Sequence, residues 1–287
     1  MSKDYGKIKK ILLLVLFFNW LVALVKIFLG LKIRSSSMTA DGFHSFSDGA
    51  SNIIGLIGIS LASRGKDENH PYGHKKYETL FTLGIAFLLF LVAFSIIYES
   101  IGRFNKKIIP EISFLSFTVM LITIGINFLV MRYERKKGLI LQSDILISDS
   151  LHTRADIFTS FSVIFAFIAI KLGFPLLDPL VSILISLIIA HSGYKITRES
   201  SSVLCDTAVI LDTKQIEDIV LKVEGVKSCH KIRTRGRADD THLDLHVQVN
   251  HTMEIEKAHK ISYAIEEKIK NTFPNITDVV VHLEPKD

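Results

Sequence analysis

The strongest constraint on this chain is a series of apolar runs, each long enough to cross a lipid bilayer. A spanning helix needs roughly 20 apolar residues. Because a bilayer offers the backbone no hydrogen-bonding partner, such runs fold as helices rather than as open strands. We therefore predict a helical membrane domain. The clearest runs are Ile11–Leu31, Leu80–Ile101, Ile112–Met131 and Leu176–Tyr194.

Two further segments, Met38–Ala62 and Leu139–Leu172, begin with His and Asp residues and then turn apolar. Counting both gives an all-α membrane domain of six helices within residues 1–200. The predicted helices cover about 8–31, 38–62, 78–102, 112–132, 139–172 and 176–197.

The remainder of the chain, residues 205–287, has the composition of a small polar domain. A mean hydropathy of +0.36 is too high for an ordinary soluble chain and too low for one that is all membrane. Helical and alternating patterns predict the order αββαβ, an α+β fold of one small sheet covered by helices. A core of about 80 residues is thin, which favours dimerisation through this domain. The predicted elements are Thr213–Val223, Val226–Thr234, Thr241–Val249, Glu254–Thr272 and Ile276–Leu283.

The distribution of basic residues predicts the orientation of the spans. The chain carries a net charge of +5, and Lys and Arg number 12 on the side of the termini against 6 on the other. This bias favours cytoplasmic N- and C-termini. A nucleic-acid partner would need a basic face with stacking aromatics, and the sequence has no such module. The two cysteines, Cys205 and Cys229, form no CxxC motif and read as free thiols.

Two of the six spans repeat the same pair of ionisable residues. His44 and Asp48 lie four residues apart, as do His152 and Asp156. Each pair shares one helix face. Ionisable groups at membrane depth cost about 2.5–3.5 kcal/mol each, so two matching pairs indicate a function.

Two imidazoles and two carboxylates suit a tetrahedral Zn²⁺ site. The alternative is a pair of polar helix faces that line water or form structural His–Asp hydrogen bonds. Asp41 and Asp149 each precede a motif histidine by three residues. They would either orient the ligands or line an entrance, or act only as solvated helix-end carboxylates.

Further histidines lie outside the spans. Asp67, His70 and His74 occupy a short loop in which Pro and Gly favour a turn, so they could chelate an ion, although exposed loops often carry such residues. The tail histidines could form a regulatory metal cluster or simply lie on the surface, and we favour the surface reading for His242 and His251. The tail candidates are His230, His242, His246, His251, His259 and His282, with Glu284 close to the last.

Taken together, these motifs give the chain a resemblance to the cation diffusion facilitator family, close to its bacterial zinc/iron efflux members. The resemblance covers nearly the whole chain and depends on four segments in order. They read ADGFHSFSDGASN, DENHPYGHKKYETL, DSLHTRADIFTS and HLDLHVQV…AHK…VVVHLEP.

The resemblance implies a six-span homodimer with a cytoplasmic, metallochaperone-like tail, working in the cell (inner) membrane by alternating access. Glu284 is a departure, because relatives with this tail site often have Asp there. Lys76 and Asp206 match a charge pair that latches the dimer in some relatives. Position by position, the resemblance implies a transport site at His44, Asp48, His152 and Asp156, a loop site at Asp67, His70 and His74, and a cytoplasmic site at His230, His246, His259, His282 and Glu284.

Histidine in both motifs favours Zn²⁺, because all-oxygen ligand sets suit Mn²⁺ better. The ions Fe²⁺, Mn²⁺, Co²⁺, Cd²⁺ and Ni²⁺ remain open. Metal binding displaces protons from imidazole and carboxyl groups, so the working hypothesis is a Zn²⁺/H⁺ antiporter whose partners are lipid, metal ions, protons and a second copy of the chain. The alternatives are a metal sensor or scaffold that does not transport and, more weakly, a membrane zinc hydrolase. No catalytic base outside the ligand set is evident, so we predict that the chain is not an enzyme.

Overall fold

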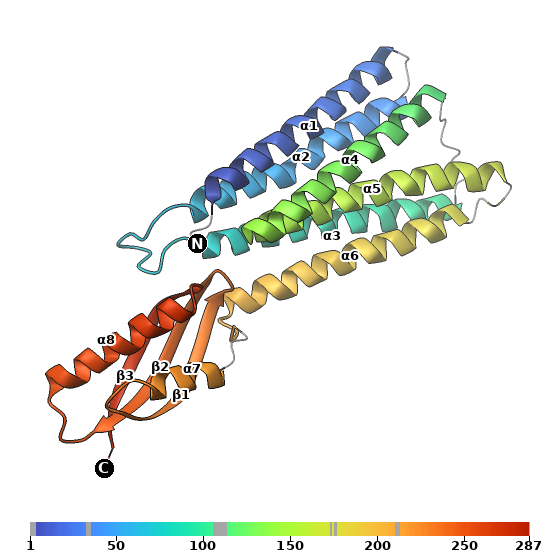
Figure 1. Ribbon diagram of the computed structural model, residues 1–287. Coiled ribbons are helices and arrows are strands. Elements are labelled where there is room, and N and C mark those ends of the chain that lie inside the picture. Colours follow the sequence, from blue (N-terminus) through green and yellow to red (C-terminus); the bar gives the residue numbers. More distant parts are fainter. Residues whose placement is uncertain are drawn as a thin grey trace. The chain divides into compact units, whose positions relative to one another are not determined.

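The computed structural model describes residues 4–32, 36–105, 114–172, 174, 177–209 and 213–286. It divides into two compact units, Asp4–Ser200 and a tail unit that contains Ser201–Asp287. The first unit is built of helices, and the second contains the strands (Figure 1).

The first unit is a bundle of long helices of 27 to 30 residues. At 1.5 Å per residue each is about 40 Å long, enough to cross a bilayer. Over the described residues, three stretches are long and apolar enough to span by composition alone: Tyr5–Leu29, Lys76–Gly102 and Phe117–Leu141. The helices are α1 (Tyr5–Lys32), α2 (Ser36–Ala62), α3 (Lys76–Asn105), α4 (Phe114–Leu141), α5 (Asp144–Lys171) and α6 (Leu177–Leu204).

The boundary between α4 and α5 differs from the prediction. Helix α4 continues to Leu141, beyond the expected end at 132, and α5 begins at Asp144 rather than at 139. The chain turns at Gln142, which has a φ of +50°. Ser143 then caps α5, because its Oγ accepts a hydrogen bond from the backbone N–H of Leu146 at 3.4 Å. The apolar run across this turn hid it from sequence reading.

The bundle has an apolar core and an apolar outer surface. Ile8 and Leu12 of α1 pack with Ile59 of α2, Ile85 of α3 and Ile145 of α5, and all of them are fully buried. Large apolar side chains are also exposed on the outside of the bundle. In water such a surface would aggregate, whereas lipid solvates it. Examples are Phe17, Phe28, Phe87, Phe94 and Leu129.

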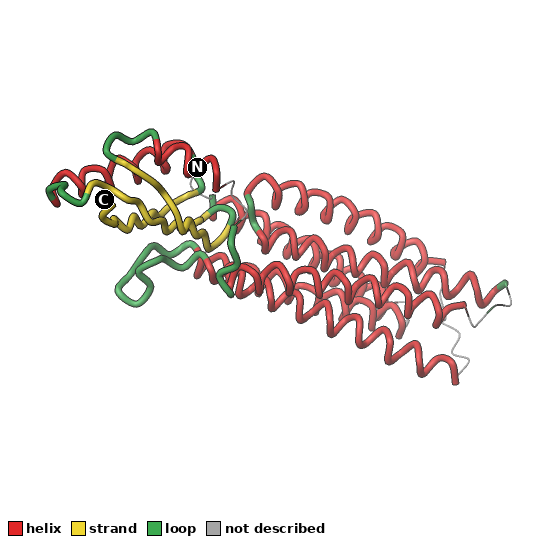
Figure 2. The backbone as a smooth tube through the Cα atoms, turned by 90° about the horizontal axis from the view of Figure 1, so that it is seen from below, coloured by secondary structure: helices red, strands yellow, loops and turns green. Residues whose placement is uncertain are grey.

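The tail unit contains a three-stranded sheet in the order β1-β2-β3, with β1 and β2 antiparallel and β2 and β3 parallel (Figure 2). The predicted αββαβ order is confirmed. Leu243, Leu245 and Val247 alternate along β2 and are buried against Ile216 of α7 and Ile265 of α8. Both helices therefore cover the same face of the sheet. The elements are α7 (Thr213–Leu221), β1 (Val226–Arg237), β2 (Asp240–Asn250), α8 (Ile255–Thr272) and β3 (Ile276–Lys286).

Candidate metal-binding sites

Two of the predicted transport ligands, His152 and Asp156, lie on α5, which packs against α2 and α4. His152 on α5 is 4% exposed. Asp156, one turn further along α5, lines a small cavity together with residues of three other helices. The side chains of Asp41, His44 and Asp48 lie outside the described residues, and α2, which carries them, packs against α5. The other residues that line the cavity are Asn19, Val22, Ser45, Thr123 and Asn127.

Several polar side chains near this cavity were missed by sequence reasoning. Lys26 of α1 is buried and donates a hydrogen bond from Nζ to Ser45 Oγ at 2.9 Å. Asn19 of α1 donates from Nδ2 to Asn52 Oδ1 of α2 at 3.0 Å. The available signal was polarity, since amides and ammonium groups within an apolar span are costly and tend to have a function.

The predicted loop residues converge in the structure. Asp67 Oδ1 lies 3.0 Å from His70 Nδ1, and Asp67 Oδ2 lies 3.4 Å from His74 Nε2. His74 is buried, and its Nδ1 lies 2.8 Å from the carbonyl oxygen of Gly65. A proton on Nδ1 would satisfy that carbonyl and leave the Nε2 lone pair facing the carboxylate, as in many metal-binding histidines. One ligand atom from each residue lies within 4.8 Å of the others.

The charge on Asp67 suits this role. Partial burial alone would raise its pKa, but the side-chain and backbone hydrogen bonds from His70 and the charges of both histidines outweigh that effect. The net result is a pKa below the ordinary carboxyl value, so the group remains an anionic ligand.

The tail site is built by strand register. His230 of β1 pairs with His246 of β2, which in turn pairs with His282 of β3. Glu284 Oε1 lies 2.7 Å from His246 Nδ1, and Oε2 lies 3.1 Å from His230 Nε2. A register irregularity follows His230 at Lys231, where φ is +50°. Such bulges commonly re-aim a neighbouring side chain.

Glu284 links the histidines through its charge. The hydrogen bond from His246 is the main cause of its lowered pKa, and partial burial is offset by the charges of His230, His246 and Lys231. The two carboxylate oxygens of Glu284 thus contact His246 and His230, which lie on two different strands.

Two predicted tail ligands stand apart from the group His230, His246 and Glu284. His282 lies at its edge, with its ring 4.6 Å from that of His246 and its Nε2 3.8 Å from Glu284 Oε1. His259 lies on α8, which covers the opposite, apolar face of the sheet, and its ring contacts Tyr263 at 4.7 Å. Within one chain the described residues thus bring together three of the five predicted ligands, as a compact group.

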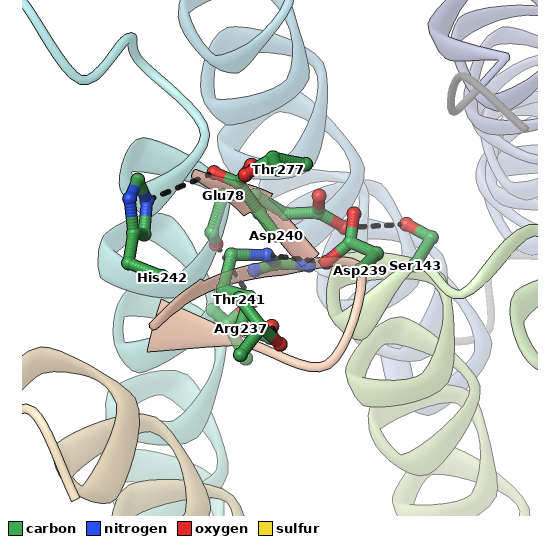
Figure 3. Close-up of polar contacts among 9 residues, drawn as sticks. Glu78, Ser143, Arg237, Asp239, Asp240, Thr241, His242 and Thr277 are labelled. Atoms are coloured by element: carbon green, nitrogen blue, oxygen red, sulfur yellow. Dashed lines mark hydrogen bonds and ion pairs between the residues drawn. The ribbon is translucent and has the colours of Figure 1, made fainter. Parts of the chain in front are cut away.

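The other residues singled out from the sequence lie outside these two groups of candidate ligands. His242 lies near the start of β2, with nitrogen–oxygen distances of 3.9 Å to Asp240 and 3.6 Å to Asp278. Its side chain is only 11% exposed, so the predicted surface position is wrong. Arg237, at the end of β1, pairs with Asp239 in the turn between the strands (Figure 3). His251 is exposed. Lys76 begins α3, and Asp206 follows α6 with a φ of +55°. The latch between this lysine and this aspartate stays a prediction.

Comparison with known proteins decides the family. Residues 12–205 match the cation efflux transmembrane domain, and residues 211–286 match the cytoplasmic domain of cation efflux proteins. The chain belongs to the cation diffusion facilitator family. It is therefore a multi-pass membrane protein of a family that exports divalent metal cations.

Relatives of this facilitator match along most of their length. An uncharacterised transporter of Methanocaldococcus jannaschii is 30% identical, over 98% of this chain and 99% of that protein. The manganese efflux system protein MneP of Bacillus subtilis is 28% identical, over 96% of each chain. The metal tolerance protein C1 of Arabidopsis thaliana is 28% identical, over 92% of this chain and 59% of that protein.

Proposed function

We propose that this facilitator exports Zn²⁺ across the cell membrane in exchange for protons. The observation that carries the proposal is the pair on α5, where His152 is buried within the bundle and Asp156 lines a cavity between four helices. The same His-x-x-x-Asp pattern recurs on α2 at His44 and Asp48. Two imidazole and two carboxylate ligands suit tetrahedral Zn²⁺ and neutralise its charge.

Proton exchange follows from the chemistry of these ligands. Zn²⁺ binds neutral imidazole and ionised carboxylate, so loading the site from the cytoplasm releases protons. When the site faces a more acidic exterior, protons compete for the same nitrogen and oxygen atoms and help to expel the metal.

Manganese is the second candidate substrate. Two relatives, MneS and MneP, are named as manganese efflux proteins. The amide groups of Asn19 and Asn127 line the same cavity as Asp156 and offer oxygen ligands, which Mn²⁺ favours. Fe²⁺, Co²⁺ and Cd²⁺ are further substrates to compare.

The remaining sites fit a regulated dimer. We place both termini in the cytoplasm, and we assign the tail unit to homodimerisation. The loop site and the tail site would bind cytoplasmic metal, and Lys76 and Asp206 would latch the two units of the dimer. A ligand can shift the protein between states only if it binds one state more tightly than the other, so the tail metal must prefer one tail arrangement.

The test is flux into proteoliposomes that contain the full chain, with Zn²⁺ or Mn²⁺ supplied alone. We expect an imposed pH gradient to drive Zn²⁺ uptake, and His152→Ala to abolish it. His251→Ala, at an exposed position, is the matched control and should transport normally. Full flux in His152→Ala would refute the site, and Mn²⁺ flux without Zn²⁺ flux would replace zinc with manganese.

A further inference from the structure

A pair of buried carboxyl groups lies between α4 and α5, apart from the proposed metal ligands. Glu134 of α4 is fully buried, and Asp149 of α5 is 1% exposed. Thr153 of α5 links the two residues, because its Oγ1 lies 3.2 Å from Glu134 Oε2 and 3.2 Å from the carbonyl oxygen of Asp149. Two neighbouring carboxylates that are both ionised repel each other strongly in an apolar interior, and a proton held by the pair would remove that repulsion.

The remaining contacts of the pair leave a place for that proton. Thr153 Oγ1 donates to Glu134 Oε2 at 3.2 Å, and Asn52 donates from Nδ2 to Asp149 Oδ2. The other two oxygens, Glu134 Oε1 and Asp149 Oδ1, are buried and have no donor among the described residues. A shared proton would satisfy both oxygens, whereas an empty site would leave two buried acceptors without a donor.

The pair is connected to the helices that carry the metal motifs. Asp149 lies three residues before His152 on α5, and Asn52 lies four residues after Asp48 on α2. Asn52 also accepts from Asn19 of α1. The network therefore joins α1, α2, α4 and α5 about one helical turn from the proposed ligands without using any of them.

We propose that Glu134 and Asp149 hold one exchangeable proton and that this proton is released when the facilitator carries its metal. The second half of the proposal rests on the proposed Zn²⁺/H⁺ exchange, and the first half does not. Movement of α2 relative to α5 would break the Asn52–Asp149 bond and alter the proton affinity of the pair. The proton would leave Glu134 or Asp149 as H⁺ and return to the same oxygens after the metal departs.

Other charged groups nearby bear on this proton. From α5, the ionisable residues are His152 and Asp156, which follow Asp149 by about one and two helical turns. From α1, the buried side chain of Lys26 donates a hydrogen bond from Nζ to Ser45 Oγ. From α3, Glu78 accepts from Ser143 Oγ at 2.8 Å, so that buried carboxyl serves as a control (Figure 3).

Infrared spectroscopy of the full chain in lipid tests whether Glu134 and Asp149 hold a proton. A protonated, buried carboxyl gives a C=O band that shifts in D₂O. We expect the wild type to show such a band at neutral pH, and both Glu134→Gln and Asp149→Asn to lose it. Glu78→Gln should keep it. If the variants at the pair retain every exchangeable carboxyl band, the pair holds no proton and the proposal is wrong.

The number of protons released per metal ion carried tests whether the proton of this pair is released during transport. Glu134→Gln mimics the protonated state and should carry metal while releasing about one proton fewer. Asp149→Asn should behave alike, and the double variant should lose the same single proton, since the pair shares it. A wild-type proton count in a transporting Glu134→Gln would overturn the coupling. If the wild type itself exchanges no protons, the proposed function fails, while the infrared result still decides whether the pair holds a proton.

Discussion

Glu284 is the residue that joins the tail site, because its two carboxylate oxygens contact histidines on two different strands. His246 is the central ligand candidate, since its ring lies against both His230 and His282. We expect His246→Ala to weaken Zn²⁺ binding at the tail at least about tenfold, or about 1.4 kcal/mol. Equilibrium dialysis of the full chain measures this change. His251→Ala is the control, and equal binding by both variants would contradict the assignment.

The lowered pKa of Glu284 also predicts a pH dependence of tail stability. A carboxyl whose pKa falls on folding stabilises the folded state above its unfolded pKa, and this contribution is lost as pH falls through the folded pKa. The ordinary value here is 4.5, so the loss belongs below that pH. Hydrogen exchange of the metal-free chain measures the free energy of unfolding of the tail. The difference in this free energy between wild type and Glu284→Gln should be constant from about pH 7 to 5 and should become smaller below about pH 4.5. The prediction would be contradicted if this difference changed between pH 7 and 5 and stayed constant at lower pH.

At the scale of helices, Gly58 allows α2 to approach two neighbours closely. A Cβ added at Gly58 would lie 2.5 Å from Phe81 Cβ of α3 and 2.9 Å from Ile145 Cδ1 of α5. Because Phe81 Cβ is fixed to its helix, Gly58→Ala must push helices apart, at a cost of about 1–3 kcal/mol. We expect a lower thermal midpoint in detergent, measured by fluorescence-detected size exclusion.

The matched control for Gly58 lies on α4. A Cβ added at Gly125 would have nothing within 4 Å. Alanine there gains up to about 1 kcal/mol of helix propensity, so Gly125→Ala should be neutral or slightly stabilising. If the two alanine variants have the same thermal midpoint, the close approach of α2 to α3 and α5 does not limit the stability of the bundle.

The helices and strands could be predicted from the sequence better than the contacts between them. The alternation of Leu243, Leu245 and Val247 was enough to identify β2 and its buried face, because side-chain direction in a strand has period two. The hydrogen bond between Asn52 and Asp149 joins residues 97 positions apart. No local pattern encodes such a pairing, which depends on how α2 packs against α5. Glu284 meets His246 for a similar reason, since parallel pairing of β2 and β3 fixes their register.

For the whole molecule, the two native cysteines report on orientation. Cys205 is exposed, whereas Cys229 is buried in the tail core. Burial, followed by the charge of Glu217, raises the pKa of the Cys229 thiol to about 11, so that thiol is neutral and unreactive near pH 7. A membrane-impermeant maleimide should therefore report on Cys205 alone in the folded protein.

Cytoplasmic termini require that this maleimide label Cys205 in inside-out vesicles and leave it unlabelled in intact cells. Cys205→Ser should abolish labelling of folded protein, whereas denaturation should restore one reactive thiol through Cys229. Labelling in intact cells but not in inside-out vesicles would reverse the topology. The tail histidines would then face the exterior, and cytoplasmic metal could not reach them. The result therefore decides whether the tail site, which contains His230 and Glu284, can bind the cytoplasmic metal that the facilitator exports.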